Sequence, residues 1–93
     1  MWKFRQHELY LKWLQKQTPK SQRQIDRRLQ KIEYHNHFGH VRDLGDGLAE
    51  LKFNDGRRIY FSVTGVNEIT LILGGNKNGQ EKDIKKAKKL LYR

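Results

Sequence analysis

The 93-residue sequence has no cysteine, one proline and no apolar run near the roughly 20 residues of a membrane span. Without cysteine, disulfides, thiolate metal sites and a thiol nucleophile are excluded. Residues 1–5 also lack the apolar core of a signal peptide. We therefore expect a cytoplasmic protein with no membrane partner and no cofactor, whose chemistry depends on Lys, Arg, Tyr, Glu or His side chains.

Acidic residues are scarce as well: 10 Asp and Glu stand against 20 Lys and Arg, a formal net charge of +10. Residues 1–42 carry a net +7 and residues 76–93 a net +5, whereas residues 43–75 carry a net −2. Such a charge on one small domain, which we place over residues 1–93, favours nucleic acid, an acidic protein or an anionic surface as partner. The alternative is a solvated surface that only keeps the protein soluble.

The hydrophobic pattern predicts an α+β domain. Apolar residues recur at helical spacing over residues 7–17 and again from Pro19 to about Tyr34, where Thr18 supplies a helix-start signal. Residues 2–5 alternate as in a short strand, and residues 35–47 predict a loop. Three strands are predicted at 48–54, 57–64 and 68–73, followed by a lysine-rich helix at about 80–91 with a capping box at Asn78 and Glu81. We expect an N-terminal helical hairpin packed on an antiparallel sheet, and a basic C-terminal helix.

The Asn-Asp-Gly turn after the first of these strands decides their register. A three-residue loop with Gly56 in the left-handed region places Leu51 opposite Ile59 on one face and Lys52 opposite Arg58 on the other. A two-residue loop would mix apolar and polar residues on the same face. We therefore predict the three-residue loop.

A second loop at residues 65–67 then pairs Phe61 with Leu71, Tyr60 with Ile72 and Ile59 with Leu73. The predicted apolar face consists of Ala49, Leu51, Phe53, Ile59, Phe61, Val63, Ile69, Leu71 and Leu73. The opposite face is expected to be open to solvent.

Three basic side chains converge on this open face. Lys52 and Arg58 are cross-strand neighbours, and Lys77 follows the third strand in a Gly-Gly-Asn-Lys turn that can fold back over the same end. Glu50 and Tyr60 form the next pair along. Because like charges directly opposite one another destabilise a sheet, the cluster suits a bound anion. Ordinary solvated residues on an exposed face are the alternative.

Three histidines, His35, His37 and His40, fall in the predicted loop. A His-x-His spacing with a third histidine can ligate zinc, but no Asp or Glu clusters with them. We expect no metal site here. The histidines are interpreted as loop residues, or as residues that approach a substrate.

Several short motifs, in this order and spacing, resemble the RelE/ParE toxin superfamily, and most closely its addiction-module killer proteins, the HigB-like and phage-derived Gp49-like subgroup. They are Gly47-Leu48-Ala49-Glu50-Leu51-Lys52, Gly56-Arg57-Arg58-Ile59-Tyr60-Phe61, Leu71-Ile72-Leu73-Gly74-Gly75-Asn76-Lys77, and Gln80 with Asp83-Ile84 and Ala87. The resemblance implies the fold predicted above. It also implies a type II toxin that cuts mRNA in the ribosome without a metal.

The resemblance assigns roles to the cluster. Arg58 matches the arginine that holds the scissile phosphate, Lys77 lies near a basic residue that stabilises the transition state, and Lys52 takes the place of an arginine. Lys52 or Glu50 is the candidate base, and Tyr60 or a protonated lysine the candidate acid. The alternative role of Glu50 is only to neutralise Lys52. Substrate contacts are expected from Arg42, Arg57, Asn76 and Lys82.

The expected partners are mRNA on the ribosome, ribosomal RNA and a cognate antitoxin, a small helix-turn-helix protein. Two alternatives stay open. One is a toxin that poisons DNA gyrase without cutting RNA, and the other is a non-catalytic module that binds RNA or an antitoxin.

Overall fold

The computed structural model describes residues 1–91. Along the chain the elements are β1 (Lys3–Gln6), α1 (Glu8–Gln15), α2 (Pro19–His35), β2 (Val41–Gly45), β3 (Leu48–Lys52), β4 (Arg57–Gly65), β5 (Glu68–Asn76), a 3-10 turn η1 (Lys77–Gly79) and α3 (Gln80–Leu91). The α+β fold with two N-terminal helices and a basic last helix is confirmed. Among the described residues, no helix is long and apolar enough to cross a membrane.

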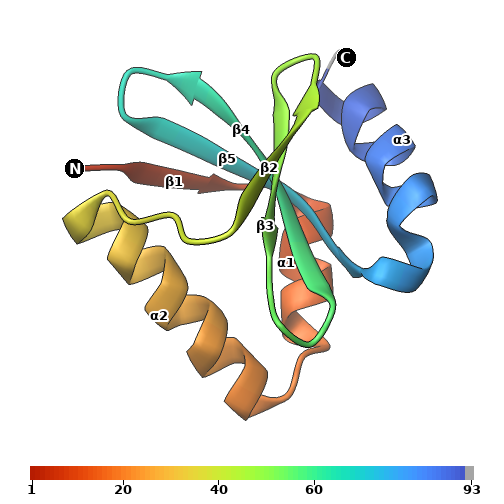
Figure 1. Ribbon diagram of the computed structural model, residues 1–93, viewed down its shortest axis with the longest axis horizontal. Coiled ribbons are helices and arrows are strands. Elements are labelled where there is room, and N and C mark those ends of the chain that lie inside the picture. The colour runs from red at the N-terminus through yellow and green to blue at the C-terminus, as the bar shows by residue number, and fades with distance from the viewer. Residues whose placement is uncertain (92–93) are drawn as a thin grey trace.

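The five strands form one mixed sheet in the order β1-β5-β4-β3-β2 (Figure 1). β3, β4 and β5 pair antiparallel, as predicted, β2 adds an antiparallel edge strand beside β3, and β1 adds a parallel edge strand beside β5. β2 lies within the segment that was predicted as a loop, so that prediction was wrong. Only Val41 and Leu44 of this strand are half-buried, and a bulge between Asp43 and Gly45 breaks its period. The sequence of β2 therefore lacks the regular alternation of apolar and polar residues from which a strand is predicted.

The first hairpin has the predicted register. Leu51 pairs with Ile59 and Lys52 with Arg58, and Gly56 has φ 95° in the turn. A positive φ of this kind is adopted at low cost by glycine alone. The three-residue loop is thus confirmed.

The second hairpin departs from prediction at a β-bulge. Phe61 pairs with Leu71 as expected, but Tyr60 pairs with Leu73 and Ile59 with Gly74. The extra residue, Ile72, shifts every later pair by one position. The predicted pairs Tyr60–Ile72 and Ile59–Leu73 were therefore wrong. Because of the shift, Leu73 packs on the face opposite to the predicted one.

Both faces of the sheet are covered. On one face, Tyr10 of α1 and Ile25 and Ile32 of α2 pack against Leu51 and other residues of β3, β4 and β5. Val63, predicted to join this core, is instead 56% exposed near the β4–β5 turn.

The other face carries a second core formed by Leu48, Tyr60, Ile72, Leu73 and Ala87, the last of these from α3. Figure 1 shows α3 on the side of the sheet away from α2. The expectation of an open face was wrong, because α3 covers the part of it that Ile72 and Leu73 make apolar.

The helix ends were partly predicted. Thr18 accepts a hydrogen bond from the Ser21 amide at 3.1 Å, and Pro19 begins α2, as expected. The capping box at Asn78 is not formed. Asn76 caps η1 instead by accepting from the Asn78 amide at 3.0 Å, and α3 then begins at Gln80. This turn brings the start of α3 onto the end of the sheet.

Candidate functional site

Three neighbouring strands place Lys52, Arg58 and Gly75 side by side on the face that α3 covers. Lys77 reaches the same end of the sheet, because its Cγ lies 3.5 Å from a Cβ built on Gly56 in the β3–β4 turn. Lys52 is half-buried and Lys77 is exposed. The structure therefore brings the three predicted cations to one end of the sheet, where Gly75 is the neighbour of Arg58.

Arg58 is the buried centre of this group, with 8% of its surface exposed. Its Nη1 lies 3.9 Å from Glu50 Oε1, while its Nε has no hydrogen-bond partner in the described part of the chain. A buried polar group without a partner is costly. The guanidinium is thus held in place, and the N–H of its buried Nε has no acceptor among the described residues.

Glu50 is fully buried beneath three donors. Arg42 Nε of β2 lies 3.0 Å from its Oε1, and Gln80 Nε2 of α3 lies 3.3 Å from each of its oxygens. Its partners are two arginines and an amide, whereas the sequence had suggested Lys52. Because these groups enclose both oxygens, Glu50 is placed to orient Arg58 and not to meet a substrate.

Tyr60 is fully buried beneath α3, and its hydroxyl has no partner among residues 1–91. Burial, followed by the negative charges of Glu50 and Asp83, raises the pKa of Tyr60 to about 12. The phenol is therefore neutral at physiological pH and shielded from solvent.

Asp83 of α3 lies against Gly75, next to Arg58. A Cβ on Gly75 would overlap the Asp83 carboxylate and lie 3.1 Å from its Cγ, and Oδ2 also lies 3.5 Å from a Cβ built on Gly79. Asp83 is half-buried. Burial raises its pKa, and the positive charges of Lys86 and Lys82 offset only part of this rise. A carboxylate with a raised pKa thus lies against Gly75, the cross-strand neighbour of Arg58.

Sequence reasoning gave Gln80 and Asp83 no role. The available signal was their three-residue spacing, which places both on one face of a helix. That face was not known to meet the sheet, because the bulge that makes Gly75 the contact of Asp83 was not predicted.

The four predicted substrate contacts are divided between the two faces. Arg42 reaches the α3 face through Glu50, and Lys82 is exposed beside Asp83 on α3. Asn76 is exposed but its side chain caps η1. Arg57 lies on the opposite face, in a groove between α2 and the β3–β4 hairpin.

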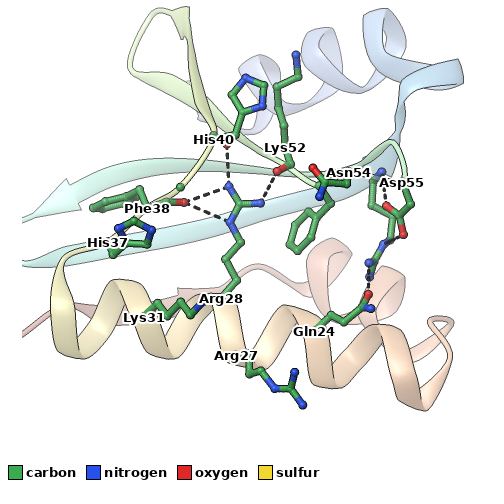
Figure 2. A pocket seen from close by; sticks show the side chains of 13 residues that line it. Gln24, Arg27, Arg28, Lys31, His37, Phe38, His40, Lys52, Asn54 and Asp55 are labelled. Atoms are coloured by element: carbon green, nitrogen blue, oxygen red, sulfur yellow. Dashed lines mark hydrogen bonds and ion pairs between the residues drawn. The ribbon is translucent and has the colours of Figure 1, made fainter.

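This groove has a volume of about 480 Å³. Its lining residues come from α2, the loop before β2, and the β3–β4 hairpin: Gln24, Arg27, Arg28, Lys31, His37, Phe38, Gly39, His40, Lys52, Phe53, Asn54, Asp55 and Arg57. Lys52 contributes mainly its backbone, since its side chain points away from Arg28 (Figure 2). Among residues 1–91, no group of three or more His, Cys, Asp or Glu side chains is placed to hold a metal ion.

Arg28 fixes the walls of the groove. Its Nη2 donates to the carbonyls of Phe38 at 3.0 Å and His40 at 2.7 Å, and its Nη1 donates to the carbonyl of Lys52. Figure 2 shows the guanidinium between the loop and β3. Arg28 thereby ties α2 to the end of the strand that carries Lys52.

Arg57 is held by several contacts on the other side of the groove. It pairs with Asp55 at 2.7 Å and donates to Gln24 Oε1 at 2.5 Å, and its guanidinium lies 4.9 Å from the centre of the Phe53 ring. Burial would raise the pKa of Asp55, but its hydrogen bonds to Arg57 and the charge of Arg57 lower it overall. Arg57 is therefore engaged within the fold.

The sequence is similar to a protein family and to a protein of known sequence. The family model described as phage derived protein Gp49-like matches residues 12–92. An uncharacterised protein of Haemophilus influenzae is 33% identical over 81 residues, which cover 84% of this chain and 81% of that protein.

Two solved structures share the fold. The intact E. coli RelBE toxin–antitoxin complex contains a chain that superposes with a TM-score of 0.69 at 16% identity, covering 82% of this chain and 96% of that chain. The isolated E. coli RelE toxin gives a TM-score of 0.69 at 15% identity, covering 92% and 98%. At these identities the likeness shows the fold. The protein thus has the RelE fold, and by its sequence it belongs to the phage-derived Gp49-like family.

Proposed function

We propose that the protein is the toxin of a type II toxin–antitoxin pair, and that it cuts mRNA on the ribosome in the cytoplasm. Membership in the Gp49-like family and the fold shared with the RelE toxin support the first part. The second part rests on one observation. Arg58 is buried with an unpartnered Nε, between Lys52 on one side and Asp83 above Gly75 on the other.

The reaction that such a site suits is transfer within the RNA backbone. The 2′-oxygen of a ribose attacks the adjacent phosphorus, the bond from phosphorus to the 5′-oxygen breaks, and the products carry a 2′,3′-cyclic phosphate and a 5′-hydroxyl. A base takes the proton of the 2′-hydroxyl, and an acid supplies one to the departing oxygen. Cations stabilise the charge that develops on the phosphorane oxygens.

The proposed role of each side chain depends on how exposed or buried it is. The Arg58 guanidinium, whose side chain is 10% exposed, binds a non-bridging phosphate oxygen, and Lys52 and Lys77 flank it as further cations. Asp83 takes the proton of the 2′-hydroxyl, because its carboxylate is half-buried beside Arg58 and its pKa is raised by burial. Glu50 was a candidate base, but its oxygens are enclosed, so its role in the proposal is to position Arg58.

The acid is a protonated lysine. Lys77 is exposed at the end of the cluster and carries a proton that the departing oxygen can receive. Tyr60, the other candidate, has a buried hydroxyl. The proposal therefore assigns Tyr60 to packing beneath α3.

Partners follow from the same proposal. The E. coli RelE fold has been solved in a toxin–antitoxin complex, and we extend an antitoxin partner to this chain on that basis. Basic side chains on α2 and α3 are suited to ribosomal RNA, where contacts to phosphates give affinity without sequence selection.

Mapping of mRNA 5′ ends after induction tests the proposal. Wild-type protein should give codon-phased ends on translated messages. Arg58→Ala should reduce cleavage about 100-fold, the usual effect of removing one donor to a developing oxyanion. Lys12→Ala, which removes one exposed charge from α1, is the control and should cleave normally.

Because Arg58 is buried, circular dichroism must show that the variant is folded, and Lys77→Ala provides an exposed second test. Lys77→Ala should lower cleavage at least tenfold without changing stability. Intact messages accompanied by DNA breaks would support a gyrase poison and overturn the nuclease.

A further inference from the structure

The groove between α2 and the β3–β4 hairpin is separate from the Arg58 cluster, because it lies on the other face of the sheet. Besides Lys52, whose side chain points away from Arg28, four basic residues line it: Arg27, Arg28, Lys31 and Arg57. Its single acidic residue, Asp55, is already paired with Arg57 at 2.7 Å. Within residues 1–91, the remaining positive charge of the groove has no carboxylate to balance it.

Arg28 makes this imbalance costly. It is half-buried, and burial lowers its pKa, yet its hydrogen-bond partners are the neutral carbonyls of Phe38, His40 and Lys52. A guanidinium remains charged at physiological pH in such a site. A charge removed from water without a counter-ion destabilises the protein. An anion in the groove would offset this charge without displacing any of the hydrogen bonds.

The aromatic residues of the groove favour an acidic protein over single-stranded RNA as the anionic partner. The Phe53 ring lies between two guanidinium groups, those of Arg28 at 4.7 Å and Arg57 at 4.9 Å. Phe38 stacks on Phe61 with ring centres 6.1 Å apart, and meets Trp2 edge to face at 5.8 Å. The Phe53 ring and one face of Phe38 thus already have partners within the protein, whereas single-stranded RNA is usually bound by stacking of its bases on free aromatic faces.

We propose that this groove binds an acidic segment of a protein partner that also carries an apolar side chain. Arg27 and Lys31 lie one helical turn apart on α2, so both face carboxylates of one segment. Phe38 and Phe53, which also line the groove, provide apolar contact beside them. A volume of about 480 Å³ accommodates a few side chains. This inference goes beyond the proposed function and does not depend on RNA cleavage.

The test is fluorescence anisotropy with a labelled short peptide in which glutamates flank a leucine. Arg27→Ala with Lys31→Ala removes two charges from the rim of the groove. Lys85→Ala with Lys89→Ala removes two exposed charges, also one turn apart, from α3 on the other face. The groove variant should bind the peptide about tenfold more weakly, and the α3 variant less than about twofold.

Amide chemical shifts locate the site directly. Addition of the peptide should move the amide signals of residues 37–40 and 53–57, and more salt should weaken binding. The proposal is overturned if the peptide fails to bind at low salt, if both double variants lose affinity equally, or if the shifts map to α3. It is also overturned if a single-stranded RNA of matched charge binds as tightly and loses as much in the groove variant.

Discussion

Gly74 and Gly75 are consecutive residues of β5 that face opposite sides of the sheet, so one substitution at each tests a different part of the protein. Neither has a positive φ, and alanine can adopt both backbone conformations. The effects of Gly74→Ala and Gly75→Ala must therefore come from what the added methyl group meets.

At Gly74 the methyl group meets the indole of Trp13. The three nearest ring atoms would all overlap it, and the most distant of them, Cε2, would lie 2.5 Å away. Trp13 packs against the core that α1 and α2 form on the sheet, so its rigid ring must move within packed surroundings. Overpacking of this kind costs about 3 kcal/mol. In a domain of this size that corresponds to a fall in Tm of roughly 12–24 °C.

At Gly75 the methyl group meets the free end of the Asp83 side chain. That carboxylate can rotate away, so the loss of stability should be below about 1 kcal/mol, and the lower entropy of the unfolded chain offsets part of it. Movement of the carboxylate by an ångström or more should nevertheless lower RNA cleavage about 10- to 100-fold if Asp83 is the base.

Thermal denaturation followed by circular dichroism and end-labelled RNA cleavage, measured on both variants, separate the two effects. Gly65→Ala is the control, since its methyl group would make only ordinary contacts with Glu68, at 3.5 Å or more. Equal loss of stability in Gly74→Ala and Gly75→Ala would refute the assignment of the two faces. Full cleavage by Gly75→Ala would refute the role of Asp83.

Three further substitutions test the supports of the site. Arg28→Ala should destabilise the fold by about 3 kcal/mol in urea denaturation, because three carbonyls lose a charged donor, while Arg27→Ala should stay within about 0.5 kcal/mol. Glu50→Gln should cost roughly 3 kcal/mol, because it leaves the buried Arg58 without its counter-ion; an unchanged urea midpoint would contradict the pairing. Burial raises the pKa of Asp83 above its unfolded value, so the native state loses stability as pH rises through that raised pKa. Asp83→Asn should therefore be more stable than wild type at neutral pH, match it below pH of about 3.9, and lose cleavage, whereas equal stability at all pH values would contradict the shift.

The parts of the fold that were predictable from sequence are those with a strong local signal. Thr18 and Pro19 mark a helix start by their own chemistry, and Gly56 allows only one turn that separates apolar from polar residues. The pairing of Lys52 with Arg58 followed from that turn. These features depend on residues close together in the chain.

The parts that were not predictable depend on contacts between distant segments. The bulge at Ile72 has no local signature, because Leu71, Ile72 and Leu73 are all apolar and fit either face. Its consequence is large: it turns Leu73 toward α3 and places Gly75 beneath Asp83. The same shift is why the predicted site contained the cations and Glu50 but lacked Asp83.

The charges of the site account for why a cluster of cations around the buried Arg58 suits this reaction. Arg42, Arg58, Lys52 and Lys77 supply four positive charges, and Glu50 and ionised Asp83 supply two negative ones. When Asp83 accepts the proton of the 2′-hydroxyl in the proposed reaction, the site becomes more positive by one charge. At the same moment the phosphate group becomes more negative by one charge. The attraction between protein and substrate therefore grows as the transition state forms, and only such an increase raises the rate of the chemical step.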